Sequence, residues 1–454
     1  MRSRPLSEIA RAVDGILHGD DAVASSIVID SRIAEPGTLF VALAGEHVDG
    51  HEFVEDALSR GAAGAMAQRR PAGQGSTIVV DDVGRALLAL AADERLAMTE
   101  VTVIAITGAN GKTSTKDLAA SVLSTRLPTH ASPASFNNEI GLPLTLLGAP
   151  ADTEVIVAEM GARREGDVTT LCAVARPGVV VLTNLGVAHM EIFGSWDAIA
   201  RSGAEPLDAL GADDVAILNA DDPVVAGFAS LTSARVRTFG ISAGADVRAE
   251  DVALDEDGRA SFALAVGDER EHVDLAVPGE HMVSNALAAA ACGAELGVSA
   301  AECAAALKGA HVSRWRMETF TTSGGARIVN DSYNANPESM AAGLKAARWM
   351  ARGTRLAAVL GHMAELGPIA LEEHERLGEL VVRIGVERLI TVGHPAKQIA
   401  RAAIREGALP TDVVSCATPE DAAADVAAWM RPGDVILVKG SRVAGLERVA
   451  EALR

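Results

Sequence analysis

The chain has 454 residues, 49% of them apolar, which is enough for two to four domains with sizeable cores. Its 61 acidic residues outnumber its 40 basic ones, giving a formal net charge of −21. This balance argues against a nucleic-acid partner, because such a surface needs clustered positive charge. No apolar run of about 18 residues and no signal peptide is evident, so we expect a cytoplasmic protein without a membrane span. Four scattered cysteines suggest buried thiols rather than zinc ligands or disulfides.

The order of apolar runs divides the chain into three blocks. Residues 1–98 mix short strands (SIVIDSR, GTLFVAL, STIVVDD) with helices, one of them from about Phe53. Residues 99–310 alternate apolar strands with helical segments, which is typical of a largely parallel sheet covered on both faces. Within that block, 236–275 is predicted to be a strand-rich excursion, and a helix-like run spans Ser284 to about Leu307. Residues 311–454 alternate again, which predicts a second, smaller doubly wound domain.

The segment VIAITGANGKTSTK, residues 103–116, is the most informative motif. A buried strand followed by a glycine turn, Lys112 and Thr113 at a helix start predicts a phosphate-binding loop. Lys112 would reach the β- and γ-phosphates, and the Thr113 hydroxyl would bind Mg²⁺. The loop is a shortened form, because Ile106 stands where the first glycine of the usual motif would be. The alternative is an ordinary glycine-rich turn between a strand and a helix.

Polar residues follow other predicted strands, where ligands bind in open α/β sheets. Glu159 and His189 could both face the γ-phosphate and hold Mg²⁺, although a helix-capping carboxylate and a structural histidine are the alternatives. The amide-rich turn at Asn137 and Asn138 is uninformative alone. In the third block, Asp331 could accept hydrogen bonds from a ribose, or it could simply belong to a turn.

Cationic residues follow the last predicted strand, DVILV, of the third block. Lys439 and Arg442 could bind a phosphate or a carboxylate there. The alternative is a solvated charge pair near a turn.

Taken in order, these motifs resemble those of the Mur ligase family over essentially the whole chain. Further matching segments include DSR (30–32), FNNEIGLPLTLL (136–147), EMGARREGD (159–167), TNLGVAHMEIFGS (183–195), NDSYNANPESM (330–340) and MAELG (363–367). The segments FNNEIG and NDSYNANP resemble the forms of these motifs in those family members that add D-alanyl-D-alanine. The resemblance implies an α/β protein of three domains: a mixed α/β UDP-sugar-binding domain (1–98), a central P-loop-type doubly wound ATP-binding domain (99–310) and a C-terminal Rossmann-like domain (311–454).

The activity that the resemblance implies belongs to peptidoglycan precursor synthesis. ATP would phosphorylate the terminal carboxylate of UDP-MurNAc-tripeptide, and the amine of D-Ala-D-Ala would attack the acyl phosphate to form an amide. ATP and Mg²⁺ are the implied cofactors, and we expect a monomer. Mg²⁺, Lys112 and the loop amides fit this chemistry. A carboxylate and a phosphoryl group are both anionic, so their charge has to be neutralised in a fixed geometry before one can attack the other.

The resemblance also implies roles for individual residues. The implied catalytic residues are Lys112, Glu159, His189 and Arg316. The implied ATP-binding residues are Gly108, Asn110, Gly111, Lys112, Thr113, Ser114, Asn285, Arg316 and Asp331. The implied substrate-binding residues are Ser31, Arg32, Asn137, Asn138, Asn334 and Asn336. Thr113 and Glu159 would hold the ATP-linked Mg²⁺, and His189 a second Mg²⁺.

Three positions depart from the family pattern. Gly203 stands where a carbamylated lysine usually supports the second Mg²⁺, and Glu205 would point about 200° away on a helix. Met282 replaces an asparagine expected near the adenine, and His362 replaces an acid. Gly203 and Met282 favour the alternative of a nucleotide-binding paralogue with lost or altered activity, whereas the retained Lys112, Thr113, Glu159, His189, Arg316 and Asp331 favour an active ligase. A relative that uses another amino acid, such as a folylpolyglutamate-synthase-like ligase, is disfavoured by FNNEIG and NDSYNANP.

Overall fold

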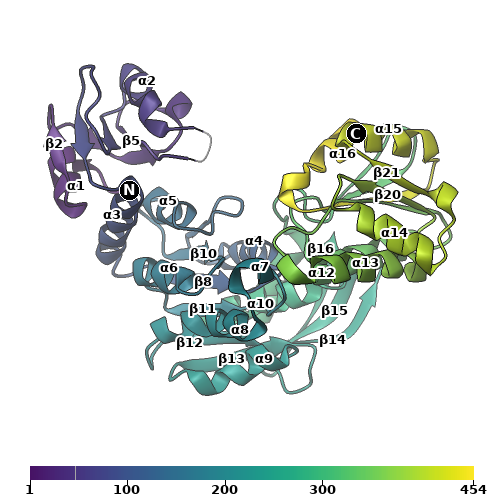
Figure 1. Ribbon diagram of the computed structural model, residues 1–454. Coiled ribbons are helices and arrows are strands. Elements are labelled where there is room, and N and C mark those ends of the chain that lie inside the picture. Colours follow the sequence, from purple (N-terminus) through teal and green to yellow (C-terminus); the bar gives the residue numbers. More distant parts are fainter. Residues whose placement is uncertain (46–47) are drawn as a thin grey trace.

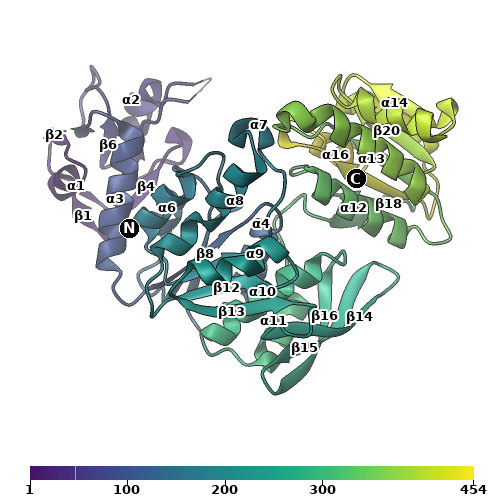
Figure 2. The same cartoon turned by 60° about the horizontal axis from the view of Figure 1, so that its bottom comes forward.

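Three larger sheets, one in each block of the sequence, define the architecture (Figure 1). A computed structural model describes residues 1–45 and 48–454. The N-terminal and C-terminal domains lie on opposite sides of the central domain, and the view turned by 60° shows the same arrangement (Figure 2). The predicted three-domain α/β fold is therefore confirmed, while the limits at residues 98 and 310 stay predictions.

The N-terminal domain contains a five-stranded sheet of order β2-β7-β6-β5-β4. Only β2 runs antiparallel to its neighbour. The elements are β1 (Arg4–Pro5), α1 (Leu6–Ala12), β2 (Ile16–His18), β3 (Val23–Ala24), β4 (Ser26–Val28), β5 (Thr38–Val41), α2 (Val54–Ser59), β6 (Gly64–Ala67), β7 (Thr77–Val79) and α3 (Val83–Ala97).

The central domain is built on a nine-stranded sheet of order β16-β15-β14-β13-β12-β11-β8-β10-β9. Strands β8 to β13 are parallel, and β14 to β16 extend the sheet as an antiparallel meander, which is the strand-rich excursion. The elements are β8 (Thr102–Thr107), α4 (Lys112–Leu123), β9 (Thr129–Ala131), α5 (Gly141–Gly148), β10 (Val155–Glu159), α6 (Asp167–Ala175), β11 (Val179–Leu182), α7 (Met190–Phe193), α8 (Trp196–Ala204), β12 (Val215–Asn219), α9 (Pro223–Gly227), β13 (Arg235–Gly240), β14 (Val247–Leu254), β15 (Arg259–Val266), β16 (Glu269–Pro278), α10 (Met282–Glu295) and α11 (Ala300–Gly309).

Alternate residues of the central strands belong to two different cores. Ile104 and Ile106 of β8 pack in one cluster with residues of α4 and α10. Val103 and Ala105 pack on the other face, in a cluster with residues of α3, α5 and α6. A strand buried on both faces reads as a continuous apolar run, which is why the sequence pattern indicated these strands clearly.

The run from Ser284 to Leu307 differs from the prediction of one helical segment. It forms two helices, α10 and α11, separated by a turn in which Gly297 adopts a φ of 77°. Ser299 then caps α11, accepting a hydrogen bond from the amide of Glu302, whose side chain binds back to Ser299. Glycine followed by such a capping box ends one helix and starts another.

The C-terminal domain has a six-stranded sheet of order β17-β18-β22-β19-β20-β21, in which only β17 is antiparallel. Its elements are β17 (Glu318–Thr321), β18 (Arg327–Asn330), α12 (Pro337–Met350), β19 (Leu356–Leu360), α13 (Ala370–Ile384), β20 (Arg388–Val392), α14 (Lys397–Glu406), β21 (Val413–Cys416), α15 (Pro419–Trp429), β22 (Val435–Lys439) and α16 (Glu447–Ala452).

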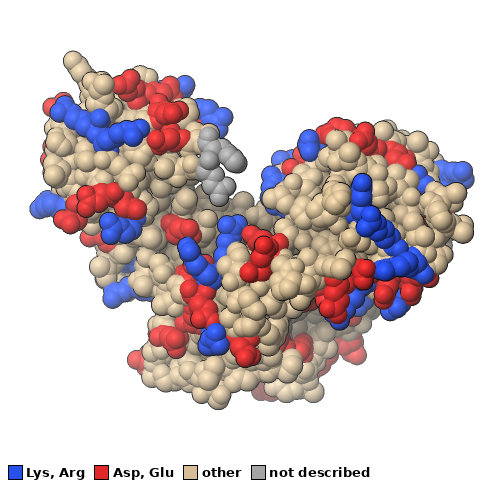
Figure 3. Space-filling model, in the orientation of Figure 1, with Lys and Arg blue, Asp and Glu red and all other residues tan. Residues whose placement is uncertain are grey.

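The surface is hollowed between the N-terminal and C-terminal domains, with the central domain beneath (Figure 3). Apolar contacts continue across the domains, because α12 shares a core cluster with α10, and α3 shares one with α5 and α6. In the part of the chain that the structure describes, no helix has the length and apolar character needed to cross a membrane.

Candidate nucleotide and metal site

The loop between β8 and α4 can be built only with glycine at two positions. Gly108 has a φ of 134° and Gly111 a φ of 81°, a backbone region that other residues rarely adopt. A Cβ atom on Gly108 would lie 2.2 Å from Oγ1 of Thr183, and one on Gly111 would lie 2.3 Å from Oδ1 of Asn285. The glycines therefore let the loop lie against β11 and α10 while its amides stay at the start of α4.

The end of β11 holds this loop in place. The amide of Asn110 donates to Oδ1 of Asn184 (2.8 Å), and the Thr183 hydroxyl donates to the carbonyl of Asn110 (2.7 Å). The amide of Ala109 donates to the carbonyl of Asn184 (2.9 Å). The sequence analysis noted Thr183 and Asn184 only as part of the TNLG motif. Their position as polar residues at the end of a strand was the signal that could have identified them.

Lys112, the first residue of α4, folds back over the loop. Its Nζ donates to the carbonyls of Gly108 and, at 3.2 Å, Ala109. Burial lowers the pKa of Lys112, while the nearby carboxylate of Glu159 opposes that change and the charge of Arg316 adds to it. Two cations and one carboxylate thus share the space beside the loop.

Glu159, at the end of β10, is 1% exposed. Its Oε1 accepts a hydrogen bond from Nδ2 of Asn137 (2.8 Å), whereas its buried Oε2 has no partner among the described residues. A buried carboxylate oxygen without a partner is costly, and hard oxygen ligands suit Mg²⁺. The donor set of Glu159 and the Thr113 hydroxyl therefore fits a magnesium ion.

Arg316 reaches the loop from the segment that joins the central and C-terminal domains. Its Nη2 donates to Oγ1 of Thr113 (2.6 Å) and to Oγ of Ser135 (3.3 Å), and its guanidinium lies 4.2 Å from the ring centre of Tyr333. Its Nε is buried without a partner in the described structure. A buried, unpaired guanidinium donor suits an anion such as phosphate. Sequence reasoning did not single out Ser135.

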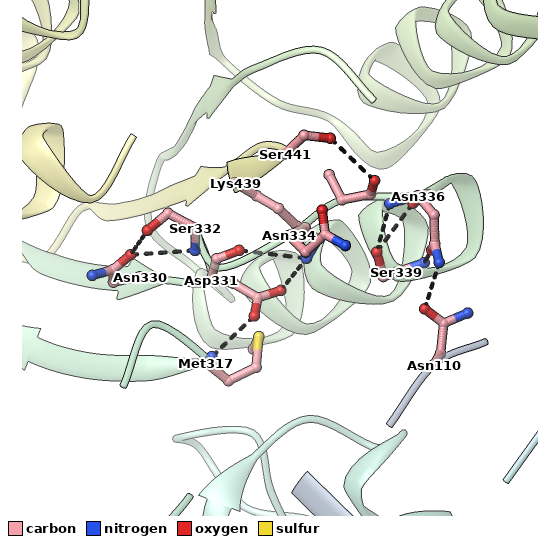
Figure 4. Close-up of polar contacts among 11 residues, drawn as sticks. Asn110, Met317, Asn330, Asp331, Ser332, Asn334, Asn336, Ser339, Lys439 and Ser441 are labelled. Carbon is pink, nitrogen blue, oxygen red and sulfur yellow. Dashed lines mark hydrogen bonds and ion pairs between the residues drawn. The ribbon is translucent and has the colours of Figure 1, made fainter. Parts of the chain in front are cut away.

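Asp331 follows β18, and both of its oxygens are bonded (Figure 4). Oδ2 pairs with Nζ of Lys439 (2.6 Å), and Oδ1 accepts from the amide of Met317 (3.1 Å). Two cations were predicted after the run DVILV. Lys439, the last residue of β22, is committed to Asp331, and Arg442 pairs with Glu447 (3.0 Å). The role of Asp331 toward a ribose stays a prediction.

Asn336 connects the third domain to the loop (Figure 4). Its Nδ2 donates to Oδ1 of Asn110 (2.7 Å), while its own Oδ1 caps α12 by accepting from the amide of Ser339 (2.9 Å). Asn334 is exposed, and its carbonyl accepts from Nζ of Lys439 (3.1 Å). Of these two asparagines, only Asn336 binds the phosphate loop.

Asn285 of α10 is buried behind the loop. Its Oδ1 accepts from the hydroxyl of Thr115 (3.3 Å), and its Nδ2 donates to the sulfur of Met282 (3.4 Å). Met282 is itself 2% exposed, so the residue that replaces the expected asparagine supports Asn285 from behind. Ser114 is buried in the first turn of α4.

The remaining predicted substrate residues lie in different surroundings. Asn138 is exposed, and its Oδ1 caps its own turn through the amide of Gly141 (2.9 Å), unlike Asn137. Ser31 and Arg32 lie in the N-terminal domain, outside the cluster around the loop. Ser31 is buried, and Arg32 pairs with Asp30 (2.7 Å).

His189 lies directly before α7 and is paired with a residue of the third domain. Its Nδ1 is hydrogen-bonded to Oε2 of Glu365, which sequence reasoning did not single out. Burial lowers the pKa of His189, and Glu365 partly opposes this. Across residues 1–45 and 48–454, no group of three or more His, Cys, Asp or Glu side chains is arranged to hold a metal. A second Mg²⁺ held by His189 therefore stays a prediction, because these residues form no cluster of further side-chain ligands of these types around it.

The position of the family lysine offers no replacement ligand. A Cβ atom on Gly203 would lie 2.5 Å from Cδ2 of Leu185, which fills that space. Glu205 accepts hydrogen bonds from the amides of Gly166 (2.7 Å) and Thr169 (3.1 Å) before α6 and in its first turn. Its carboxylate is thus committed to the start of α6.

Together, the doubly wound central sheet and its glycine loop define a nucleotide-binding protein of the phosphate-loop type. Comparison with known proteins narrows this class. Residues 24–95 match "Mur ligase family, catalytic domain", residues 106–293 match "Mur ligase middle domain", and residues 315–442 match "Mur ligase, glutamate ligase domain". The chain belongs to the Mur ligase family, as its motifs indicated.

Similar proteins cover nearly the whole chain. A UDP-N-acetylmuramoyl-tripeptide–D-alanyl-D-alanine ligase of Mycobacterium tuberculosis is 41% identical over 95% of this chain and 92% of its own. The enzyme of that name from Bacillus subtilis is 35% identical over 100% and 99%. A crystal structure of MurF from Acinetobacter baumannii superposes with a TM-score of 0.88 at 30% identity, covering 99% and 98%. MurF from Thermotoga maritima in complex with ADP gives 0.81 at 28% identity, covering 95% and 97%.

Proposed function

We propose that this chain is an ATP-dependent ligase that joins D-alanyl-D-alanine to UDP-N-acetylmuramoyl-tripeptide in the synthesis of peptidoglycan precursors. Relatives at 33–41% identity carry this activity in their names, and the alignments span nearly the full length of both chains. A structural relative was solved with ADP, which supports the use of ATP.

One observation from the site carries the proposal. Beside the phosphate loop, the chain buries an unpaired carboxylate oxygen of Glu159 and an unpaired guanidinium nitrogen of Arg316. Each is costly to bury alone, and both would be satisfied by a metal-bound nucleotide phosphate. A site that only stabilised the fold would not need both groups.

The residues present fit the chemistry of acyl-phosphate formation. The peptide carboxylate attacks the γ-phosphoryl group as the bond to the bridging oxygen breaks and ADP leaves, so two anions must approach each other in line. Lys112, Arg316 and the loop amides supply positive charge and hydrogen-bond donors on the nucleotide side. The dipeptide amine then attacks the activated carbonyl, phosphate leaves, and the amide forms.

Thr113 and Glu159 would hold the Mg²⁺ that accompanies ATP, and His189 would contribute to a second ion. Bound there, Mg²⁺ would neutralise charge on the transferring phosphoryl group. The chain's own task is to keep Glu159 dry and oriented through Asn137, and to present the Thr113 hydroxyl at the start of α4.

The rest of the assignment follows the domains. Ser31 and Arg32 would contact the uridine diphosphate from the domain of residues 1–98. Asn285 and Asp331 would contact the nucleotide, bound between residues 99–310 and 311–454. Asn138, Asn334 and Asn336 would face the peptide or dipeptide. We expect a cytoplasmic location, because ATP and the nucleotide-linked substrate are intracellular compounds. We also keep the expectation of a monomer.

One observation favours a second candidate, a nucleotide-binding paralogue without ligase activity. Gly203 supplies no ligand where the family lysine would help to hold a second Mg²⁺. The intact loop, Glu159 and Arg316 are as expected for an active enzyme, so the ligase is the preferred function.

The decisive experiment is an assay with each substrate omitted in turn. We expect phosphate release only when ATP, Mg²⁺, UDP-MurNAc-tripeptide and D-Ala-D-Ala are all present, with the pentapeptide product identified by mass spectrometry. ATP binding without any amide product would instead identify the paralogue. Comparing tripeptides with meso-diaminopimelate or lysine at position three would define the substrate further.

A further inference from the structure

The segment that carries His189 meets the C-terminal domain at Glu365. Nδ1 of His189 is hydrogen-bonded to Oε2 of Glu365, and the amide of Glu191 donates to the backbone carbonyl of Glu365 (3.1 Å). The two segments are 176 residues apart in the chain. The contact therefore forms only when the third domain lies against the central one.

The backbone on both sides of this contact has an uncommon conformation. His189 and Glu365 both have a φ of 60°, in the left-handed region that residues with a Cβ rarely adopt. Gly367, with a φ of 53°, approaches so closely that a Cβ there would lie 2.8 Å from Cα of Glu191. Such conformations persist where the surroundings hold them, and they gather at functional sites.

The hydrogen bond leaves one nitrogen of His189 available. With Nδ1–H donated to the carboxylate, the lone pair of the neutral ring is on Nε2. No described residue hydrogen-bonds to Nε2, and 28% of the side chain is exposed. A carboxylate that orients a histidine in this way is the usual outer partner of a metal-binding imidazole.

We propose that Glu365 is a positioning residue for His189, which orients the ring and keeps Nε2 as a ligand for a divalent cation. This inference rests on the proposed function, in which His189 contributes to a second Mg²⁺. Because Gly203 provides no side chain and Leu185 fills its space, the ligand set depends more heavily on His189. The central domain would then acquire its oriented histidine only when the third domain docks.

The test uses Mn²⁺ as a paramagnetic substitute, titrated by electron paramagnetic resonance into the full-length protein with a non-hydrolysable ATP analogue. We expect Glu365→Ala to weaken the second Mn²⁺ by about 10- to 100-fold. Glu365→Gln should retain most of the affinity, because its amide oxygen still accepts from Nδ1–H. Glu372→Ala is the matched control: that residue lies in α13 of the same domain, its side chain is 61% exposed, and among the described residues it pairs with Arg376 alone. It should bind Mn²⁺ as the wild type does.

A second readout separates orientation from a general loss of packing. In protein labelled with ¹⁵N-histidine, the signal of His189, identified by its absence in His189→Gln, should report the tautomer with the proton on Nδ1. That signal should become a mixture of tautomers in Glu365→Ala and persist in Glu365→Gln. Unchanged Mn²⁺ affinity and tautomer in Glu365→Ala would overturn the inference and leave the proposed ligase activity standing. If the Mn²⁺ affinities and the tautomers are as expected but the wild-type protein has no ligase activity, the proposed function is contradicted and the role of Glu365 is not.

Discussion

Replacing Asn137 by alanine tests how the buried carboxylate of Glu159 is supported. The variant removes the hydrogen bond from Nδ2 of Asn137 to Oε1 of Glu159, which measures 2.8 Å. Because Oε2 already has no partner in the described structure, neither oxygen of a side chain that is 1% exposed would then be bonded. Hydrogen bonds to charged groups contribute about 1.5–3 kcal/mol, so we expect the free energy of unfolding to fall by about 2 kcal/mol.

The neighbouring residue provides the control. Asn138 is exposed, and among the described residues its side chain caps its own turn, through the amide of Gly141 at 2.9 Å, so Asn138→Ala should lower the free energy of unfolding by about 0.5–1 kcal/mol. Glu159→Gln removes the buried charge. In that background Asn137→Ala should cost only about 1 kcal/mol, which gives a coupling energy of about 1 kcal/mol between the two side chains.

The measurement is urea denaturation followed by circular dichroism, with hydrogen exchange of the β10 amides as a local readout. Adding Mg²⁺ and a non-hydrolysable ATP analogue should recover part of the loss, because a bound cation would pair with the carboxylate. A change below about 0.5 kcal/mol in Asn137→Ala, which surface substitutions also give, would refute the reasoning. A coupling energy of zero would do the same.

Three further predictions concern the loop, the missing lysine and acid stability. Lys112→Ala should abolish turnover and leave the circular dichroism spectrum unchanged; near-normal phosphate release would contradict its placement beside the phosphates. Bicarbonate should not stimulate the enzyme, because Gly203 cannot be carbamylated, and strong stimulation would show that this account is wrong. Burial lowers the pKa of His374 below 6.5, and its Nε2 accepts from the amide of Met363 (3.0 Å), so the folded state binds fewer protons than the unfolded state. The free energy of unfolding should therefore fall as the pH drops through 6.5, and less steeply in His374→Gln; equal slopes in urea titrations would argue against this.

Much of the fold and the centre of the site could be predicted because their signals are local. Strand β8 is buried on both faces, and the loop after it follows directly in sequence, so apolar runs and glycine spacing were sufficient. The turn between α10 and α11 also had a local signal, Gly297 followed by Ser299, but the apolar residues on either side suggested one continuous helix. The features that could be predicted in this way are those encoded within a few neighbouring residues.

Contacts between domains could not be predicted in the same way. The bond between Asn336 and Asn110 joins residues 226 positions apart, and Glu365 reaches His189 over 176 positions. Such pairs depend on how the domains dock, which no spacing in the sequence reveals. The resemblance to a family supplied roles for residues, whereas the structure showed that Asn137 binds Glu159 while Asn138, next to it, caps its own turn.

The position of α3 has a consequence for dividing the protein. This helix ends the N-terminal block, yet it packs against α5 and α6 of the central domain and joins their core cluster. Leu87, Leu90 and Ala91 of α3 are each 0% exposed. Cutting the chain at residue 98 would separate α3 from the apolar surface that it covers, leaving both fragments prone to aggregation. We therefore expect the first two domains, although separate in topology, to unfold together and to be stable only when expressed in one piece.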